Sequence, residues 1–178
     1  MSVVQGHPKF DPNRLKQGGY VLYFRHGSAE VGKDIKDNSK EHWWQSTDPS
    51  LTRQLDDKGT RQALSIGSAM REEHIPVDEV LCSEFRRTED TAFLMGLGRP
   101  QRSSDLTPLA YDDSTLPERI EKHLNHEPAP GNNTILVAHG HVTELFGELD
   151  EGDAAVFDPG AGKSEFVGFI DYEDWNLQ

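Results

Sequence analysis

Two short segments of the chain, 20–24 and 134–138, are apolar almost throughout, and each ends abruptly in polar residues. An uninterrupted apolar run of this length is typical of a strand that is buried on both faces of a sheet. Arg25 and His26 follow the first run, and His139 follows the second. Because ligands of open α/β sheets bind outside the carboxyl ends of the strands, we expect both groups of residues at a ligand-binding edge.

The remaining segments alternate between helical and extended patterns. Apolar residues at helical spacing, with charged residues between them, predict helices over 56–74, 84–97, 114–124 and 142–149. Short apolar runs predict further strands at 79–83 and 103–106, and a closing hairpin made of 154–157 and 165–170. Strands that alternate with helices predict an α/β fold: three layers, with a mostly parallel central sheet flanked by helices and a C-terminal β-hairpin.

The length of 178 residues suits a single domain spanning 1–178, in which residues 1–18 form a loosely structured lead-in. The segment 28–50 is polar and long for a loop of a compact domain, and such loops are usually functional or disordered. Its adjacent residues Trp43 and Trp44 argue against disorder. We expect them to pack as a small local core, and the alternative is that they line a substrate pocket.

Composition excludes several classes of protein. A formal net charge of -13 argues against a nucleic-acid-binding protein, which needs a basic surface. No apolar run approaches the roughly 20 residues of a membrane helix. The amino terminus lacks the pattern of a signal peptide, so we expect a cytoplasmic protein, and a secretory signal removed before residue 1 is the alternative.

The single cysteine, Cys82, rules out an internal disulfide and is expected to be a buried, inert thiol. Oligomeric state does not follow from the sequence.

Basic residues gather at the predicted strand ends of this otherwise acidic chain. Arg86 and Arg87 open a helix directly after the strand at 79–83, and they join Arg25 at the same edge of the sheet. A guanidinium group binds phosphoryl oxygens with two hydrogen bonds, and a helix start adds backbone donors. A neutral histidine nitrogen can accept a phosphoryl group covalently, and a second, protonated histidine would complete the clamp. The pattern therefore predicts a pocket for a phosphorylated substrate.

Three of these segments together resemble the histidine phosphatase superfamily, also called phosphoglycerate mutase-like. They are Arg25-His26-Gly27, the segment 83–92 with Arg87, and Val-Ala-His-Gly at 137–140. The resemblance extends to Arg-Gln-Leu at 53–55, Lys-Gly at 58–59 and Gln-Ala at 62–63, so that it covers the chain from about residue 20 to 147. Each short motif alone is weak evidence, whereas the ordered set at strand ends and helix starts is specific.

The resemblance implies a role for each matching residue. His26 would be the nucleophile that takes the phosphoryl group. The residues implied to bind the phosphate around it are Arg25, Arg87, His139 and Gly140. Arg86, beside the motif position, would be exposed or at the rim of the pocket. The family usually has proline where this chain has Glu84, and we expect this difference to alter the local turn but not the chemistry.

The acid that protonates the leaving group is the weakest part of the match. Family members often place a Glu or Asp in the loop after the third strand, and Asp112 and Asp113 occupy that region. Asp112 is the expected acid, and a solvated acidic turn is the alternative interpretation. Glu144 is a less favoured candidate. Some relatives lack the acid and act on labile groups such as phosphohistidine.

The predicted activity is that of a phosphatase without metal or cofactor, which hydrolyses a phosphomonoester or a phosphoprotein through a phosphohistidine on His26. A phosphoglycerate mutase-type phosphotransferase and a non-catalytic phospho-ligand-binding protein are the alternatives. A third is a metal site made of His139 and His141 with Asp112 or His42. We favour it less because arginines directed at the same point would repel a divalent cation.

Overall fold

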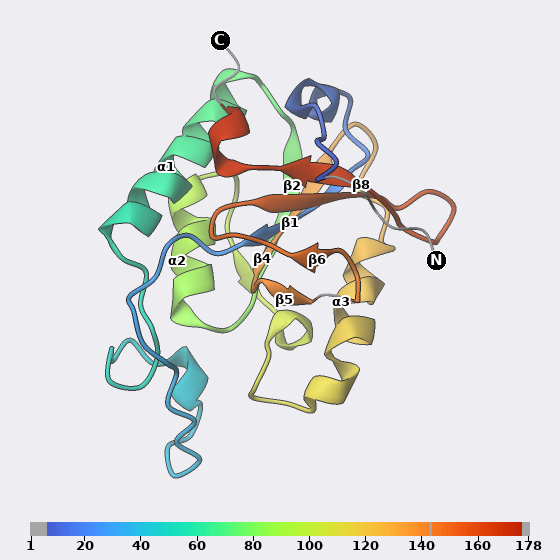
Figure 1. The fold of residues 1–178 in the computed structure, drawn as a ribbon. Coiled ribbons are helices and arrows are strands. Elements are labelled where there is room, and N and C mark those ends of the chain that lie inside the picture. Colours follow the sequence, from blue (N-terminus) through green and yellow to red (C-terminus); the bar gives the residue numbers. More distant parts are fainter. Residues whose placement is uncertain (1–6, 143, 176–178) are drawn as a thin grey trace.

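A computed structural model describes residues 7–142 and 144–175 of the chain, and a six-stranded sheet lies at its centre (Figure 1). Its strands are, in spatial order, β3 (Gln101–Arg102), β2 (Val77–Cys82), β4 (Asn133–Ala138), β1 (Val21–Arg25), β7 (Ala154–Asp158) and β8 (Glu165–Ile170). The first four are parallel, whereas β7 is antiparallel to β1, and β8 is antiparallel to β7. The predicted α/β fold, with its mostly parallel sheet and C-terminal hairpin, is confirmed.

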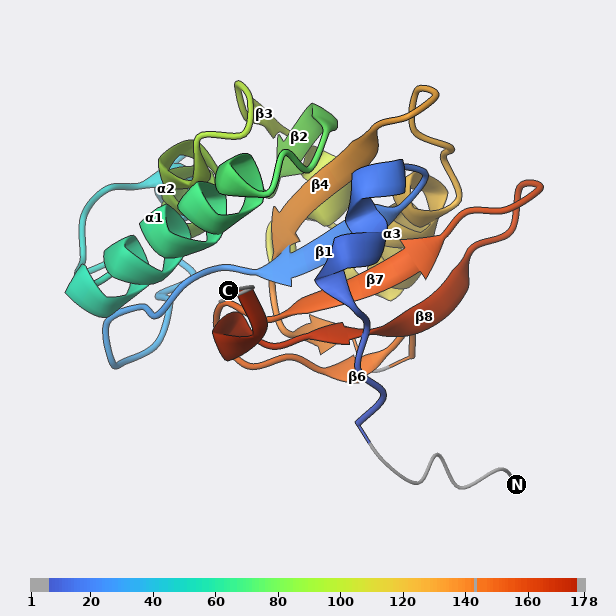
Figure 2. The same ribbon diagram turned by 90° about the horizontal axis from the view of Figure 1, so that it is seen from above.

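Helices cover both faces of the sheet (Figure 2). They are α1 (Asp57–Glu72), α2 (Arg86–Met95) and α3 (Leu116–Leu124). Side chains alternate along β1, so that Leu22 and Phe24 join one core with α1 and α2, while Val21 and Tyr23 join a second core with α3. The arrangement gives the three predicted layers. None of the helices in the described ranges combines the length and the apolar surface that crossing a membrane requires.

The structure corrects two of the predicted elements. Residues 103–106 are not a strand, because β3 ends at Arg102 and is followed by the 3₁₀ turn η3 (Ser104–Leu106). The segment 142–149 is not a helix, because it belongs to a short antiparallel pair, β5 (His141–Val142) and β6 (Gly147–Glu148). Gly147 has φ of 91°, outside the right-handed helical region, so the chain cannot run through this residue as a helix although its apolar residues have helical spacing. Residue 143 of this segment lies outside the described residues.

The lead-in is better defined than predicted. Residues 1–6 lie outside the described residues, but residues 7–18 include the 3₁₀ helix η1 (Pro12–Gln17) and bury Phe10 and Leu15 in the core. Before η1 the chain runs beside β8. The N–H of Phe10 donates to the carbonyl of Phe169 over 2.8 Å, and the N–H of Phe169 donates to the carbonyl of Pro8 over 2.7 Å. Two isolated apolar residues in a polar stretch give too weak a pattern to predict this packing.

Strand pairing brings the ends of β1, β2 and β4 to one edge of the sheet. Arg25 lies opposite Ala138, so β1 and β4 stop together. The hydrogen bonding continues one step beyond the strands, because the N–H groups of His26 and Ser83 each donate to a carbonyl of β4 over 3.0 Å. The residues that follow the three strands, His26, Ser83 and His139, therefore meet at one edge of the sheet, as the sequence predicts.

Candidate active site

His26 is buried and held in one tautomer. Its Nδ1 atom lies 2.6 Å from the carbonyl oxygen of Gly27, and because a carbonyl can only accept, Nδ1 carries the hydrogen. The Nε2 atom therefore keeps its lone pair and accepts a hydrogen bond from Nε of Arg87 over 3.2 Å. Burial and the charge of Arg87 lower the pKa of His26 to about 3. A neutral imidazole in this state is a competent nucleophile.

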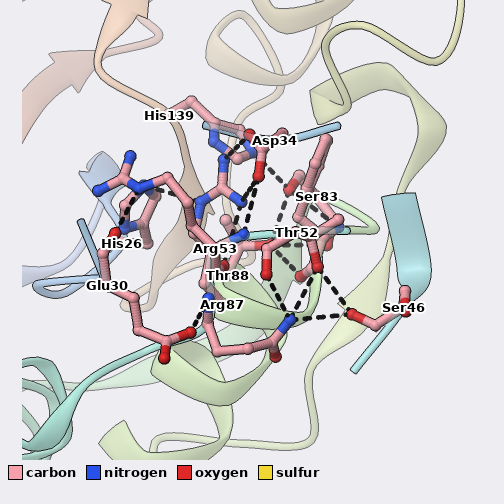
Figure 3. A network of polar contacts seen from close by, with 12 residues as sticks. His26, Glu30, Asp34, Ser46, Thr52, Arg53, Ser83, Arg87, Thr88 and His139 are labelled. Carbon is pink, nitrogen blue, oxygen red and sulfur yellow. Dashed lines mark hydrogen bonds and ion pairs between the residues drawn. The ribbon is translucent and has the colours of Figure 1, made fainter. Parts of the chain in front are cut away.

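Arg87 reaches this point from the second residue of α2, and its side chain is only 6% exposed. Its guanidinium group stacks over the ring of Phe85, 4.7 Å from the ring centre. The two terminal nitrogens donate to the carboxylate oxygens of Asp34 over 3.0 and 2.9 Å (Figure 3). Asp34 belongs to the polar segment 28–50, and no motif of the sequence drew attention to it.

His139 is linked to the start of α2 through two hydroxyl groups. The hydroxyl of Thr88 donates to the carbonyls of Ser83 and Phe85, so the Oγ1 atom of Thr88 accepts from Ser83 Oγ over 2.7 Å. Ser83 Oγ in turn accepts from Nε2 of His139 over 2.8 Å. Nδ1 is thus the ring nitrogen left for a ligand. Burial and the charge of Arg87 hold the pKa of His139 well below its usual value, which favours the neutral ring in the ligand-free site.

Arg25 lines the same cavity as His26 and Arg87. One terminal nitrogen donates to the carbonyl of Leu149 over 2.8 Å, while its buried Nε atom has no hydrogen-bond partner among the described residues. Gly140 lies directly against it, because a Cβ atom at that position would come within 2.8 Å of both Arg25 Cδ and Leu149 O. Gly140 is therefore required for the packing of this arginine, whatever it contributes to a ligand.

The third arginine of the site is Arg53 and not Arg86. Arg53 lines the same cavity as His26, and its Nε atom donates to the carbonyl of Glu30 over 2.7 Å. Arg86 pairs on the surface with Asp90 over 2.9 Å, in agreement with the exposed position expected for it. The motif that contains Arg53 carried part of the family resemblance, but nothing in its pattern showed that it would reach the pocket.

These residues line a cavity of about 390 Å³ that also has a large apolar surface. Its polar lining includes Arg25, His26, Arg53, Arg87, His139 and Gly140. Its apolar lining comes mainly from η3, the loop after it and α3, and consists of Tyr23, Leu106, Pro108, Leu109, Leu116, Pro117, Ile120 and Val142. A cavity with convergent cations and an apolar wall suits an anionic group attached to a less polar body.

The carboxylates expected as acids are placed differently from one another. Asp112 is not part of the cavity lining. Its carboxylate caps the 3₁₀ turn η4 (Asp113–Thr115) by accepting from the N–H and the hydroxyl of Ser114. These hydrogen bonds lower the pKa of Asp112, which is the opposite of what a proton donor needs. The structure thus argues against Asp112 as the acid. Asp113 and Glu144 do line the cavity, together with Asp34.

Trp43 and Trp44 form the small local core that we favoured. Trp43, in the 3₁₀ turn η2 (Trp43–Gln45), is buried and packs edge-on against Phe85 and Trp44, with ring centres 5.9 and 6.0 Å apart. Trp44 packs in the same way against Tyr111. The two tryptophans line a neighbouring hollow of about 360 Å³ but not the cavity of His26.

This packing predicts a structural effect for Trp43. Trp43→Ala is expected to lower the free energy of unfolding by about 3–5 kcal/mol, the usual cost of removing a large buried aromatic side chain. Chemical denaturation measures it. Phe93→Ala is the control, because Phe93 is 70% exposed and its loss should change stability by less than about 0.5 kcal/mol. An unfolding free energy equal in both variants would show that the tryptophan core contributes nothing.

Glu84 joins the two loops beside the site. Its carboxylate oxygens accept from the hydroxyl of Tyr111 over 2.7 Å and from Nε2 of Gln45 over 3.1 Å. Burial and this carboxylate raise the pKa of Tyr111 to about 12. The residue that replaces the family's usual proline therefore connects the tryptophan core to the loop after η3, beyond the local turn in which we expected its effect.

His139 and His141 both line the cavity, but Asp112 and His42, the further ligands of the alternative metal site, do not join them there. Nε2 of His139 is already bonded to Ser83, and His42 lies on the exposed loop against Trp44. In the part of the chain that the structure describes, no group of three or more histidine, cysteine or acidic side chains is suited to hold a metal ion. Cys82 is buried, and burial raises the pKa of its thiol to about 12, as expected for an inert side chain.

The sheet topology and the residues at the strand ends define a phosphoglycerate mutase-like α/β protein. The sequence matches the model of the histidine phosphatase superfamily (branch 1) over residues 21–111, more than half of its length, and the chain belongs to this superfamily. The matched range includes β1, α1, β2 and α2, and with them Arg25, His26, Arg53 and Arg87.

Solved structures with the same fold include two named phosphatases. The protein histidine phosphatase SixA in complex with tungstate superimposes with a TM-score of 0.59 at 21% identity, over 89% of this chain and 99% of that one. A putative α-ribazole-5′-P phosphatase from Escherichia coli gives a TM-score of 0.60 at 15% identity, over 86% of this chain and 96% of that one. At these identities the likeness concerns the fold.

A curated relative is the agropine synthesis reductase of Rhizobium rhizogenes. It is 24% identical over 156 aligned positions, and the match covers 74% of this chain and 35% of the relative. The chain therefore spans about a third of the length of the curated relative that it matches.

Proposed function

We propose that the protein is a phosphatase that hydrolyses a phosphomonoester or a phosphorylated protein through a covalent phosphohistidine on His26. The observation that carries the proposal is the state of this imidazole: neutral, fixed by Gly27 with its hydrogen on Nδ1, and with the Nε2 lone pair beside Arg87. The fold likeness to a phosphatase solved with tungstate, a tetrahedral oxyanion, supports the same assignment.

The first step transfers the phosphoryl group to the protein. The guanidinium groups of Arg25, Arg53 and Arg87 hold the phosphoryl oxygens, and each donor that strengthens its contact in the transition state contributes about 10²–10³ in rate. Nε2 of His26 attacks phosphorus, so an N–P bond forms while the bond from phosphorus to the leaving oxygen breaks. The dianion raises the pKa of His139, whose Nδ1 then takes up a proton and completes the clamp.

The leaving oxygen takes its proton from a carboxyl group of the cavity wall or, where the leaving group is labile, directly from water. Besides Asp34, whose carboxylate is paired with Arg87, the lining carboxylates are Asp113 and Glu144. In the second step a water molecule attacks the phosphorus of the phosphohistidine, so that an O–P bond forms while the N–P bond breaks. The proton that the water loses passes to the carboxylate that protonated the leaving group, or to solvent. Inorganic phosphate leaves, and His26 returns to its neutral state.

The wall of the cavity favours this reaction over a phosphoglycerate mutase reaction. A phosphoglycerate carries an anionic carboxylate near its phosphate, and a mutase must hold both groups. Besides its cations, this cavity has an apolar wall and the carboxylates Asp113 and Glu144, which would repel a second anion. An apolar or cationic leaving group fits the cavity better.

The direct test is turnover of para-nitrophenyl phosphate in the presence of EDTA, combined with acid-free quenching to trap a labelled phosphoenzyme. We expect metal-independent hydrolysis and a phosphoenzyme that is stable in alkali and labile in acid, as phosphohistidine is. Loss of activity in EDTA would contradict the proposal in favour of a metal enzyme. Binding of phosphate without turnover would favour a non-catalytic binding protein, and phosphoryl transfer within phosphoglycerate would favour a mutase.

A further inference from the structure

The phosphate-binding face of Arg87 is already occupied in this structure. Asp34 places both carboxylate oxygens on the two terminal nitrogens of Arg87, at 3.0 and 2.9 Å (Figure 3). The side chains are 12% and 6% exposed, so the pair is well shielded from water. A carboxylate and a phosphoryl group present two oxygens to a guanidinium group in the same way. They therefore compete for the same face of Arg87.

The remaining contacts of the pair show a closed resting arrangement. The third nitrogen of Arg87, Nε, donates to the Nε2 lone pair of His26 over 3.2 Å. The Oδ1 atom of Asp34 also accepts from the main-chain N–H of Arg53 over 3.0 Å. Each of the three nitrogens of the Arg87 guanidinium group thus has an acceptor in the ligand-free site, Asp34 for the two terminal nitrogens and His26 for Nε. A substrate must exchange with Asp34 before Arg87 can hold it.

The chain around Asp34 allows such an exchange. The residues before it, 31–33, are exposed, and Gly32 has φ of 138° with nothing near the position of a Cβ atom. Val31 is fully exposed. After Asp34, the N–H of Ile35 donates to the carbonyl of Leu51 over 2.7 Å and anchors the loop. Asp34 therefore lies between an exposed stretch of the chain and a residue held by a main-chain hydrogen bond, so its displacement need not disturb the packed core.

We propose that Asp34 is a built-in competitor of the substrate: its carboxylate occupies Arg87 in the empty site, is displaced by the phosphoryl group and returns when phosphate leaves. The inference rests on the proposed function, because it requires that Arg87 binds phosphate. The affinity of the pocket for a phosphoryl group then depends on how much more tightly Arg87 binds the phosphoryl group than it binds the carboxylate of Asp34. Release of phosphate is also favoured, because Asp34 returns to Arg87 as phosphate leaves.

The test is the binding of inorganic phosphate to Asp34→Asn, measured by titration calorimetry and as the inhibition constant in para-nitrophenyl phosphate hydrolysis. Asparagine keeps the size of the side chain and removes its charge, so we expect phosphate to bind about tenfold more tightly. Glu41→Gln is the matched control, because it removes one negative charge from the same loop at a side chain that is 89% exposed. It should bind phosphate like the wild type.

The outcomes separate this inference from the proposed function. If Asp34→Asn binds phosphate as the wild type does or more weakly, Asp34 holds Arg87 in position and the competitor is overturned. If wild type and variant both fail to bind phosphate, the proposed phosphate site itself is overturned. Hydrogen exchange of the wild type gives an independent measurement should the variant not fold. Saturating phosphate should speed hydrogen exchange at the N–H of Arg53, which loses Asp34 as its acceptor. Unchanged protection of this N–H would contradict the displacement of Asp34 by phosphate.

Discussion

His26→Ala is expected to lower the rate of phosphate ester hydrolysis by at least about 10³-fold and to abolish the labelled phosphoenzyme. The variant removes the only side chain whose neutral state, tautomer and position next to Arg87 suit attack on phosphorus among the residues that the structure describes. Steady-state kinetics and phosphoenzyme trapping measure the two effects.

The loss should be chemical and not structural. The side chain of His26 makes its hydrogen bonds only to Gly27 and Arg87 within the described residues, so thermal unfolding should shift little compared with the effect on turnover. His126→Ala is the control, because this histidine is exposed and lies outside the cavity. A His26→Ala protein that keeps a tenth of the wild-type rate would remove the basis of the phosphohistidine mechanism.

Arg87→Ala is expected to lower kcat/KM by about 10²–10³-fold, the usual effect of removing one donor that stabilises the charge of a transition state. It is also expected to destabilise the fold, by at most the roughly 3–5 kcal/mol that a buried charge costs without its partner, because the carboxylate of Asp34 loses its cation and must turn toward water. Kinetics and chemical denaturation report the two effects separately. Arg86→Ala, which removes a surface arginine one residue away, should change neither by much.

A double variant separates catalysis from folding. Arg87→Ala combined with Asp34→Ala removes the uncompensated charge as well, so stability should recover most of what Arg87→Ala loses. Turnover should stay low, because no guanidinium group returns to the site. If turnover recovers together with stability, Arg87 acts through the fold and takes no direct part in holding the phosphoryl group.

The sequence predicted those parts of the site that depend on strand ends. His26, Ser83 and His139 each follow an apolar run, and parallel strands necessarily bring such residues to one edge. Asp34 could not be predicted in this way. It lies in a segment without hydrophobic periodicity, and its partner Arg87 is 53 residues away, so only the folded chain shows the contact.

The errors in the predicted secondary structure have a similar origin. Val142 and Leu149 have the apolar character of a helical face, but Gly147 turns the segment into a short antiparallel pair. The strand at 103–106 was predicted next to the true one because Leu106, the apolar signal, is buried from a 3₁₀ turn. In both segments a few apolar side chains are buried, but the backbone that carries them is not the helix or the strand that their spacing predicts.

The hydrogen bonds between residues 8–10 and Phe169 have a consequence for how copies of the chain behave together. β8 is the last strand of its sheet, and an edge strand with free N–H and carbonyl groups is a template on which a second chain can add a strand. The segment that carries Pro8 and Lys9 occupies part of this edge. Proline lacks an N–H and lysine carries a charge, two features that discourage further strand addition. The same short segment that anchors the start of the fold thus protects it against edge-to-edge aggregation.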